Sequence, residues 1–426
     1  MAELVDARDS KSRSRKGVRV QFPPWAPENN KLVMGKHLIV HYGELGLKGG
    51  NKGYFEDVLK RNLMRVLRDI GVKTQINYIL GRFIVRIPAE FDEKVICEAV
   101  GLVAGIEYFL IAQMVELDFD KISKALVDSI ARIKDGKYET FNVRIKKSQE
   151  TLPFERLKSE KEFGAALLVN EIDLKVKMKE PDLPIIVECF ADKAYIAFGK
   201  KPGLGGLPVG TGGKLLCLLS SGFDSPVAAF KMMRRGARVD FIHFSGQPYS
   251  KKDELNQVQK IAKILTKYQG ESKLIVIPFG KIQKELSMNT GVPKKLLVVL
   301  YRRLMLKIAE KAAYRFRAKA LITGESFGQV ASQTLKNMVA IDRSIDFPVF
   351  RPLIGFDKRE IIDESRKIGT HDISALPCTD TCSLFMPKSP EVAASLEEVL
   401  EAEKHIDIGG IIQESIDRQM DVQKLS

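Results

Sequence analysis

Residues 215–226 read LLCLLSSGFDSP. Five apolar residues of strand length lead into a turn of small residues, and Pro226 follows where a helix can open. A strand, a small-residue turn and a helix N-terminus in succession place several backbone N–H groups around one anion. Ser220 and Ser225 add hydroxyl donors, and Gly222 lets the backbone approach a phosphate closely. The segment therefore predicts a phosphate-binding loop at the end of a buried strand.

The C-terminal half repeats this strand-then-helix pattern. Short apolar runs occur at residues 214–219, 239–244, 274–278 and 320–323, with helical patterns between them. Such alternation predicts an α/β domain with a doubly wound parallel sheet, which we assign to residues 201–426. Sheets of this kind bind ligands at the carboxyl ends of their strands, where the predicted loop lies.

Two smaller α+β units precede this domain. Residues 34–106 show the order strand, Gly-rich turn, helix, two strands, helix, which suits a ferredoxin-like unit. Residues 107–200 contain four strand patterns and two helical patterns and form a second α+β unit. Residues 200–210 read KKPGLGGLPVG, and this Gly/Pro-rich composition is typical of a linker between domains. The chain is therefore expected to be multidomain.

Residues 1–33 differ from everything after them. They are basic, contain proline and show neither the helical nor the strand spacing of apolar residues, which is typical of a disordered segment. Met34 stands directly before the first convincing strand, so a second interpretation makes Met34 the natural start and residues 1–33 a non-native extension. N-terminal mass analysis of the natively expressed protein decides between the two.

Composition narrows the class of protein. Apolar residues make up 45% of the chain, but no apolar stretch is long enough to span a bilayer and no signal peptide is apparent. Five cysteines are an odd, sparse set that fits a reduced cytosol without a zinc site, so we expect a cytoplasmic protein with no membrane partner. The net charge of +14 fits a polyanionic partner, or equally a generally soluble basic surface.

Two charged residues suggest chemistry at the loop. Asp224 cannot be explained by attraction to phosphate, so it is expected to hold a magnesium ion that bridges phosphate oxygens, or to orient the loop. Lys358 precedes a helical pattern and can neutralise charge on the α-phosphate or on leaving pyrophosphate. The alternatives are an ordinary Ser/Gly turn that caps a helix, with Asp224 in its first turn, and a solvated lysine at a helix start.

The loop and several distant strings resemble known proteins. Residues 220–225 resemble the Ser-Gly-Gly-x-Asp-Ser loop of ATP pyrophosphatases, with Ser221 in place of the usual glycine, and no lysine follows as in GTPase loops. The further strings are HYGELGLKG at 41–49, GGLPVG at 205–210, HF at 243–244, RRLM at 302–305, TGESFGQVASQT at 323–334, RPLI at 351–354 and CSLF at 382–385. Together they resemble the tRNA 4-thiouridine synthetase (ThiI) family.

This resemblance implies a ferredoxin-like domain, a THUMP RNA-binding domain and a pyrophosphatase-loop domain of the adenine nucleotide alpha hydrolase type. It implies adenylation by ATP, with Mg²⁺, at O4 of uridine eight in tRNA, and then sulfur transfer from a persulfide. His243 and Phe244 would line the adenine pocket. The candidate nucleotide contacts are Leu219, Ser220, Ser221, Gly222, Ser225, His243, Phe244, Arg302, Gly324 and Gln333. Residues 323–329 would lie beside the nucleotide and the target base. The alternative for this turn is a helix N-cap at Ser326.

Thiol chemistry is expected in the loop LPCTDTCS at residues 376–383. By resemblance, Cys382 attacks the persulfide sulfur or resolves a disulfide after it, and Cys378 is the candidate partner. The other cysteines lie within helix or strand patterns and are expected to be inert core residues. They are Cys97, Cys189 and Cys217.

The chain departs from some members of the family after Pro390, where only a helical tail is expected in place of a rhodanese domain. A persulfide must then come from a separate cysteine desulfurase, or form on Cys382 or Cys378 itself. A side role in thiamine-thiazole synthesis, known for some members, is weakened by this departure.

The candidate RNA-binding surface surrounds TFNVRIKK at residues 140–147. Strand alternation puts its apolar residues on one face and Asn142, Arg144 and Lys146 on the other. A basic face suits phosphate contacts with a folded RNA, whereas the alternative is a solvated strand edge protected by lysines. The predicted RNA contacts are Arg144, Lys146, Lys147, Arg156 and Lys158.

Two other functions stay open from the sequence. One is a pyrophosphatase-loop ligase or amidotransferase that acts on a small molecule, although no glutaminase domain is apparent. The other is a non-catalytic tRNA-binding protein with a dead nucleotide pocket, for which Ser221 is the only hint. A homodimer is expected by analogy alone, since one tRNA must touch one domain and be modified at another.

Overall fold

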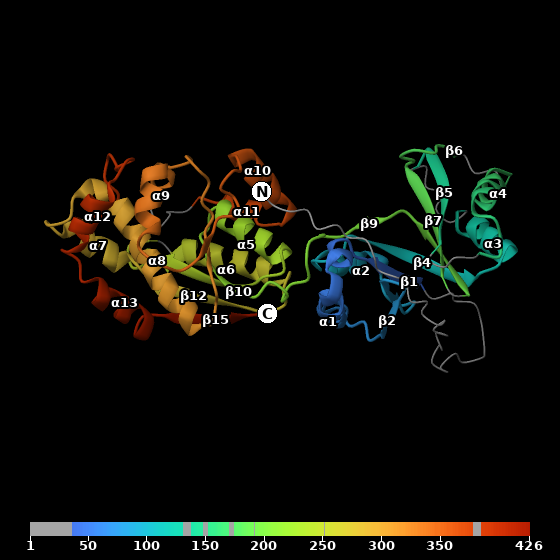
Figure 1. Cartoon of the computed structure of the whole chain (residues 1–426), viewed down its shortest axis with the longest axis horizontal. Helices are drawn as coiled ribbons and strands as arrows, with labels where there is room; N and C mark the ends of the chain where they lie inside the picture. Colours follow the sequence, from blue (N-terminus) through green and yellow to red (C-terminus); the bar gives the residue numbers. More distant parts are fainter. Residues whose placement is uncertain are drawn as a thin grey trace, which may run out of the picture. The chain divides into compact units, whose positions relative to one another are not determined.

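The computed structural model describes residues 36–130, 138–147, 152–169, 174–190, 192–250, 252–377 and 385–426. The predictions for residues 1–33 and Met34, and for Cys378 and Cys382, fall outside these ranges. Within them the strands form two sheets (Figure 1). No helix of the described ranges combines the length and the apolar character needed to cross a membrane.

The first sheet contains the strands of both predicted α+β units. Its elements are β1 (Lys36–His41), η1 (Glu44–Leu47), η2 (Gly49–Asn51), α1 (Lys52–Asp69), β2 (Ile76–Ile79), β3 (Arg82–Arg86), α2 (Glu93–Gly101), β4 (Tyr108–Glu116), α3 (Phe119–Ile130), β5 (Thr140–Lys147), α4 (Arg156–Val169), β6 (Lys175–Val176), β7 (Leu183–Phe190), β8 (Lys193–Phe198) and β9 (Lys201–Pro202). The strand order is β2-β3-β1-β4-β8-β7-β5-β6, and β9 pairs with β4.

β4 connects the two units into one ladder. It pairs antiparallel with β1 on one side and with β8 on the other. The predicted linker at residues 200–210 also contributes β9 to this sheet. Each unit keeps its own apolar core, one formed with α1 and α2 and the other with α3 and α4. The two units therefore share a sheet while packing their helices separately.

The second sheet belongs to the C-terminal half. Its elements are β10 (Lys214–Leu218), α5 (Asp224–Arg234), β11 (Arg238–Ser245), α6 (Lys252–Thr266), β12 (Ser272–Pro278), α7 (Gly280–Met288), η3 (Lys294–Leu296), α8 (Leu297–Arg315), β13 (Leu321–Ile322), η4 (Ala331–Gln333), α9 (Leu335–Asp342), β14 (Val349–Phe350), α10 (Lys358–Lys367), α11 (His371–Ser374), α12 (Leu396–Glu403), α13 (Ile408–Asp417) and β15 (Asp421–Leu425). The strand order is β14-β13-β10-β11-β12-β15.

Strands β14, β13, β10, β11 and β12 pair in parallel, which confirms the doubly wound sheet. Alternate residues of β10 point to opposite faces. Leu215 and Cys217 pack with α5 and α6, whereas Leu216 packs with α8. Helices cover both faces, so the strands are apolar runs without polar alternation. The loop after β10 therefore opens at the carboxyl edge of the sheet.

The structure corrects two expectations and excludes one alternative. The tail after Pro390 is not only helical, because β15 pairs antiparallel with β12 and satisfies the backbone groups of that edge. Helix α5 begins at Asp224 and not at Pro226, which lies in the first turn, where its missing N–H has no intrahelical partner to lose. No helix begins at Ser326, whose hydroxyl donates to the carbonyl of Phe356 at 2.7 Å.

A buried ion pair inside this domain gives a stability prediction. The Arg303 side chain is 1% exposed, and its Nε and Nη2 lie 2.8 and 2.7 Å from the two carboxylate oxygens of Glu403. Glu403→Ala leaves a buried unpaired charge, so we expect the free energy of unfolding to fall by about 3–5 kcal/mol. Glu401→Ala on the same helix removes an exposed pair and is expected to leave the thermal midpoint unchanged. Equal midpoints for the two variants would contradict this assignment.

Candidate active site

The phosphate loop is closed at its base by Ser225. The Ser225 Oγ accepts a hydrogen bond from the Ser220 N–H at 2.8 Å and lies 3.0 Å from Ser220 Oγ. Just before Ser220, the Leu219 N–H donates to the carbonyl of Ile242, and this bond extends the β10–β11 ladder into the loop. The Ser220 amide is thus used inside the loop. The amides in the first turn of α5 have no intrahelical partner, so they are the ones available to bind an anion.

Ser221 fits the loop without strain. The non-glycine residues with positive φ in the described ranges are Leu80, Glu180, Arg317 and Phe385, so Ser221 has an ordinary backbone conformation. A serine is therefore tolerated where the pyrophosphatase loop usually has glycine. A Cβ on Gly222 would meet Ser220 Oγ at 3.6 Å, which is ordinary contact, so the protein packing does not itself require glycine there.

Gly324 brings the 323–334 string against the loop. A Cβ at this position would lie 2.6 Å from the Ser225 amide nitrogen and 2.8 Å from the Asp224 carbonyl carbon. Only glycine allows the turn after β13 to pack this closely on the start of α5. The next residue, Glu325, lies 3.5 Å from Arg302 of α8, so Arg302 also belongs to this neighbourhood.

Asp224 and Lys358 meet at the loop. The Lys358 Nζ lies 2.6 Å from Asp224 Oδ1, and Gln329 Nε2 donates to Asp224 Oδ2 at 3.2 Å. The two charged residues are 134 positions apart in the sequence, and their side chains are 44% and 22% exposed for Lys358 and Asp224. A capping box between Asp357 and Glu360 fixes the start of α10 and so fixes the position of Lys358.

Helices α10 and α11 also cover the loop. The Lys358 Nζ lies 5.5 Å from the ring centroid of Phe223, whose other neighbour is the His371 ring at 5.6 Å. The Ser374 hydroxyl donates to the carbonyl of Gly222 at 3.2 Å. Sequence reasoning did not find Phe223, His371 or Ser374, because nothing in their local pattern indicates which distant loop they will contact.

The predicted nucleotide contacts His243, Phe244 and Gln333 have buried side chains. His243 and Phe244 are 2% and 6% exposed; the His243 Nδ1 donates to the carbonyl of Leu219 at 2.9 Å, and the Phe244 ring packs edge-on against Phe279. A contact to adenine from either position would therefore come from the main chain at the end of β11. Gln333 is also 6% exposed, and its Oε1 accepts no hydrogen bond from the described part of the chain.

The predicted RNA contacts divide into two groups. Arg144 and Lys146 are engaged within the protein: Arg144 Nη2 donates to the carbonyl of Met178 at 3.1 Å, and Lys146 Nζ donates to the Tyr108 hydroxyl at 2.8 Å. Arg156 and Lys158 are exposed at the start of α4. Lys147 ends β5, and its side chain lies outside the described atoms.

The described cysteines do not form a reactive site. Cys189 and Cys217 are fully buried, as predicted, and burial raises the pKa of the Cys189 thiol to about 12. Cys97 is only partly buried, and burial raises the pKa of its thiol as well. A raised pKa keeps the thiol protonated and unreactive at neutral pH.

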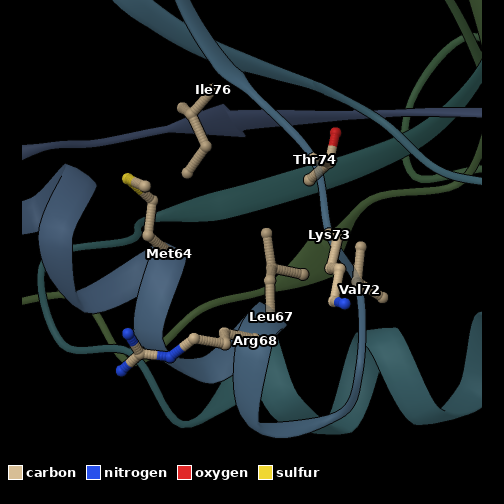
Figure 2. A pocket seen from close by; sticks show the side chains of 7 residues that line it. All are labelled: Met64, Leu67, Arg68, Val72, Lys73, Thr74 and Ile76. Atoms are coloured by element: carbon tan, nitrogen blue, oxygen red, sulfur yellow. The ribbon is translucent and has the colours of Figure 1, made fainter.

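A pocket elsewhere in the chain is not the nucleotide site. It measures about 240 Å³ and lies between α1 and β2, where Met64, Leu67 and Ile76 supply its apolar wall (Figure 2). Arg68, Val72, Lys73 and Thr74 complete its lining. No predicted site residue is among these seven. The described residues also contain no group of three or more His, Cys, Asp and Glu side chains placed to hold a metal ion.

The parallel sheet and the loop at its carboxyl edge define a pyrophosphatase-loop domain, and two α+β units precede it. A family model described as "Thiamine biosynthesis protein (ThiI)" matches residues 210–408. The ThiI ferredoxin-like domain matches residues 37–109, and the THUMP domain matches residues 116–198. These matches confirm the predicted class of each domain.

Whole-chain comparisons agree with the domain matches. A "Probable tRNA sulfurtransferase" of Caldanaerobacter subterraneus subsp. tengcongensis is 41% identical over 87% of this chain and 95% of that protein. The protein of the same name from Alkaliphilus oremlandii is 38% identical over 91% of this chain and 98% of that protein. A crystal structure of a 4-thiouridine synthetase–RNA complex with bound ATP superposes with a TM-score of 0.83, at 33% identity, over 92% of this chain and all of that chain. The chain belongs to the ThiI family.

Proposed function

We propose that this chain is an ATP-dependent tRNA sulfurtransferase that converts uridine eight of tRNA into 4-thiouridine. The observation that carries the proposal is the Asp224–Lys358 pair at the phosphate loop, in a chain whose relatives are named for this activity. The solved relative with bound ATP and RNA supports ATP and tRNA as the two substrates.

The loop supplies the activation step. The amides at the start of α5 hold the pyrophosphate end of ATP, because the helix N-terminus attracts anions. The uridine O4 attacks the α-phosphorus, the bond from that phosphorus to the bridging oxygen breaks, and pyrophosphate leaves. Lys358 moves from Asp224 to the charge that develops on the phosphates, which a partly exposed lysine can do at little cost.

Asp224 fits a magnesium ion bound together with nucleotide. Magnesium in nucleotide sites is commonly held by one or two carboxylates plus substrate phosphates, so a lone carboxylate at the loop suffices. The Asp224 carboxylate is partly exposed, and its present partners are the terminal groups of a lysine and a glutamine side chain. Bound there, the ion would neutralise charge on the phosphate oxygens.

The second step replaces oxygen with sulfur. A persulfide sulfur attacks C4 of the adenylated uridine, and the bond from C4 to the activated oxygen breaks with release of AMP. A second thiolate then attacks the cysteine sulfur of this adduct, the sulfur–sulfur bond breaks with its electron pair on the sulfur at C4, and 4-thiouridine is released while a disulfide stays on the protein. Cys382 is the residue that we assign to the persulfide or to the disulfide that remains after transfer, with Cys378 as its partner. A separate cysteine desulfurase is the proposed donor, and a supporting role in thiamine-thiazole synthesis would use the same sulfur path.

We assign RNA docking to the THUMP part, with the exposed Arg156 and Lys158 as its basic contacts. Arg156→Ala combined with Lys158→Ala is expected to weaken tRNA binding about tenfold and to lower the slope of log affinity against log salt by about one to two. Filter binding over a series of salt concentrations measures both quantities. Lys263→Ala combined with Lys267→Ala removes the same charge from exposed positions of the catalytic half and should change neither quantity. Equal losses of tRNA affinity for the two double variants would contradict the assignment of RNA binding to Arg156 and Lys158.

One reaction tests the whole proposal. Purified protein is mixed with unmodified tRNA, ATP, magnesium, cysteine and a cysteine desulfurase, and the absorbance band of 4-thiouridine is followed together with pyrophosphate. We expect both signals with normal tRNA and neither with tRNA that carries cytidine at position eight. Pyrophosphate that depends on ammonia and a small molecule would favour the ligase alternative. ATP and tRNA binding without either product would favour the non-catalytic one.

Two further proposals concern the oligomeric state and the cellular location of the protein. A homodimer would let one tRNA contact the THUMP part of one subunit while its uridine enters the loop of the other, and sedimentation of the free and tRNA-bound protein tests this. The cytoplasmic location stays a prediction from composition.

A further inference from the structure

An exposed aromatic pair in the catalytic half has no role in the chemistry described so far. The rings of Tyr249 and Phe385 pack edge-on, with 5.3 Å between their centroids, and the Lys284 Nζ lies 5.2 Å from the centroid of the Tyr249 ring. Tyr249 comes from the turn after β11, Lys284 from α7, and Phe385 from the chain before α12. Three separate segments therefore meet in one surface site, which we call the aromatic site (Tyr249, Phe385 and Lys284).

The turn that carries Tyr249 is closed by backbone hydrogen bonds. The N–H groups of Tyr249 and Ser250 both donate to the carbonyl of Gly246, at 2.9 and 3.0 Å. The start of α7 packs on this turn, because Gly280 lies so close to the Gly246 carbonyl that a Cβ would not fit. Lys284 stands one turn further along α7. The packing of α7 on the turn therefore fixes Lys284 beside the Tyr249 ring.

The backbone of Phe385 indicates that this pair is held in place by the fold. Its φ of 55° lies in the left-handed region, which bulky residues rarely adopt. Such strained conformations persist where the surrounding structure enforces them, and they are concentrated at functional sites. The strained residue directs its half-buried ring against Tyr249.

The aromatic site lies at the same edge of the sheet as the phosphate loop. Strands β10 and β11 are parallel neighbours, with Leu218 paired to Ile242. The phosphate loop follows β10 and the Tyr249 turn follows β11, so both stand at the carboxyl ends of adjacent strands. A tRNA that brings its uridine to the phosphate loop therefore carries the neighbouring nucleotides over this edge.

The chemistry of the aromatic site suits a base that has left the RNA stack. Enzymes that act on a base take it out of the stack, and aromatic rings replace the stacking that displaced bases lose. Tyr249 is 42% exposed with both of its neighbours in place, so the site is open as it stands. Lys284 is exposed, and no carboxylate of the described residues forms an ion pair with it, so its charge is available to a phosphate.

We propose that Tyr249 and Phe385 stack on a nucleotide base adjacent to the target uridine, and that Lys284 binds the phosphate of that nucleotide. The site adds an RNA contact in the catalytic half to the docking assigned to the THUMP part, and it rests on tRNA as the substrate. By holding the adjacent base outside the stack, the site favours the tRNA conformation in which the uridine reaches the α-phosphate. Its loss should therefore slow the reaction of bound tRNA and leave docking intact.

Replacing Tyr249 separates the effect of an aromatic face from that of apolar bulk. Tyr249→Leu is expected to lower the maximal rate of tRNA-dependent pyrophosphate release about tenfold in single-turnover reactions, because the base loses its stacking partner. The tRNA concentration at half-maximal rate should change less than about twofold, since docking is assigned elsewhere. Tyr249→Phe should keep the wild-type rate, because stacking needs the ring and not the hydroxyl. Lys284→Ala should lower the rate and make it less dependent on salt.

Tyr314 supplies a matched control. It is 61% exposed and its ring centroid lies 5.1 Å from that of Phe347, but it stands at the end of α8, before β13 begins, and so at the amino edge of the sheet. Tyr314→Leu should therefore release pyrophosphate at the wild-type rate. An equal loss in both leucine variants, or an unchanged rate for Tyr249→Leu, would overturn the proposal. A fall in the ATP affinity of Tyr249→Leu, measured by calorimetric titration, would place the ring at adenine and overturn it as well.

A cross-link that needs no turnover separates this proposal from the proposed function, and it decides the matter even if Tyr249→Leu does not fold. Wild-type protein binds tRNA that carries 4-thiouridine at position seven or nine, together with a non-hydrolysable ATP analogue, and near-ultraviolet light then cross-links the thiolated base to its contacts. We expect mass spectrometry to find Tyr249 or Phe385 in the cross-linked peptide from at least one of these positions. Cross-links to these residues from neither position would overturn the aromatic site, even in an active enzyme. Cross-links without any pyrophosphate release would support the site and contradict the proposed activity.

Discussion

Replacing Asp224 with alanine is expected to lower tRNA-dependent release of pyrophosphate at least about a hundredfold while tRNA affinity stays unchanged. The carboxylate is the partner of Lys358 and the candidate magnesium ligand at the loop. Its removal leaves the phosphates without that ion and Lys358 without its resting position. The proposed RNA contacts lie on β5 and α4, in the part of the chain that contains the other sheet, so tRNA affinity should not fall with activity. Single-turnover pyrophosphate release and filter binding measure the two effects.

Asp253 offers a matched control for this variant. It lies exposed in the first turn of α6, the helix after β11, just as Asp224 lies in the first turn of α5 after β10. Asp253→Ala removes the same favourable interaction with a helix dipole without touching the loop. We expect its pyrophosphate release to stay near the wild-type rate. If Asp224→Ala retained full release, Asp224 would act only on the dipole of α5 and the magnesium assignment would fail.

The loop and the sheet can be predicted from the sequence because both depend on residues that are close together in the chain. Apolar runs such as 215–219 are too short for helices and too apolar for half-exposed strands, so they indicate buried parallel strands. The loop after β10 combines small residues with a helix start, and both features are local. Each strand that frames the loop was therefore predicted to within a few residues.

Contacts between distant residues could not be predicted in this way. The Asp224–Lys358 pair and the Glu325–Arg351 pair depend on how α10 and β14 fold back over the loop. Strand β15 was missed because a five-residue segment at the end of a helical tail pairs only when the edge of β12 is available. The shared ladder through β4 was missed for the same reason, since strand patterns do not specify their partners.

Burial explains why some expected contacts need another interpretation. The HF string at 243–244 ends a parallel strand, where ligand contacts are expected, but both side chains point into packed protein. A residue at a strand end presents its main chain as well as its side chain, and a sequence pattern does not tell which of them faces the ligand. His243 instead supports the loop through Leu219.

Cys382→Ser is expected to abolish 4-thiouridine formation while pyrophosphate release stays within about twofold of the wild-type rate. A serine hydroxyl cannot carry or resolve a persulfide sulfur, whereas adenylation of the uridine needs only the nucleotide site. Thiouridine absorbance and pyrophosphate release, measured on the same reaction, separate the two steps.

Cysteines elsewhere in the chain supply the control for the sulfur path. Cys97→Ser changes the described cysteine that is only partly buried, and the raised pKa of that thiol predicts normal thiolation. Cys378→Ser reports on the second thiol of the loop: a loss of turnover that a strong reductant restores identifies Cys378 as the resolving partner of Cys382. Full thiolation by Cys382→Ser would place the sulfur on Cys378 or leave it on the donor protein. The adenylating loop would keep its function in that case, because activation at O4 does not depend on which thiol delivers the sulfur.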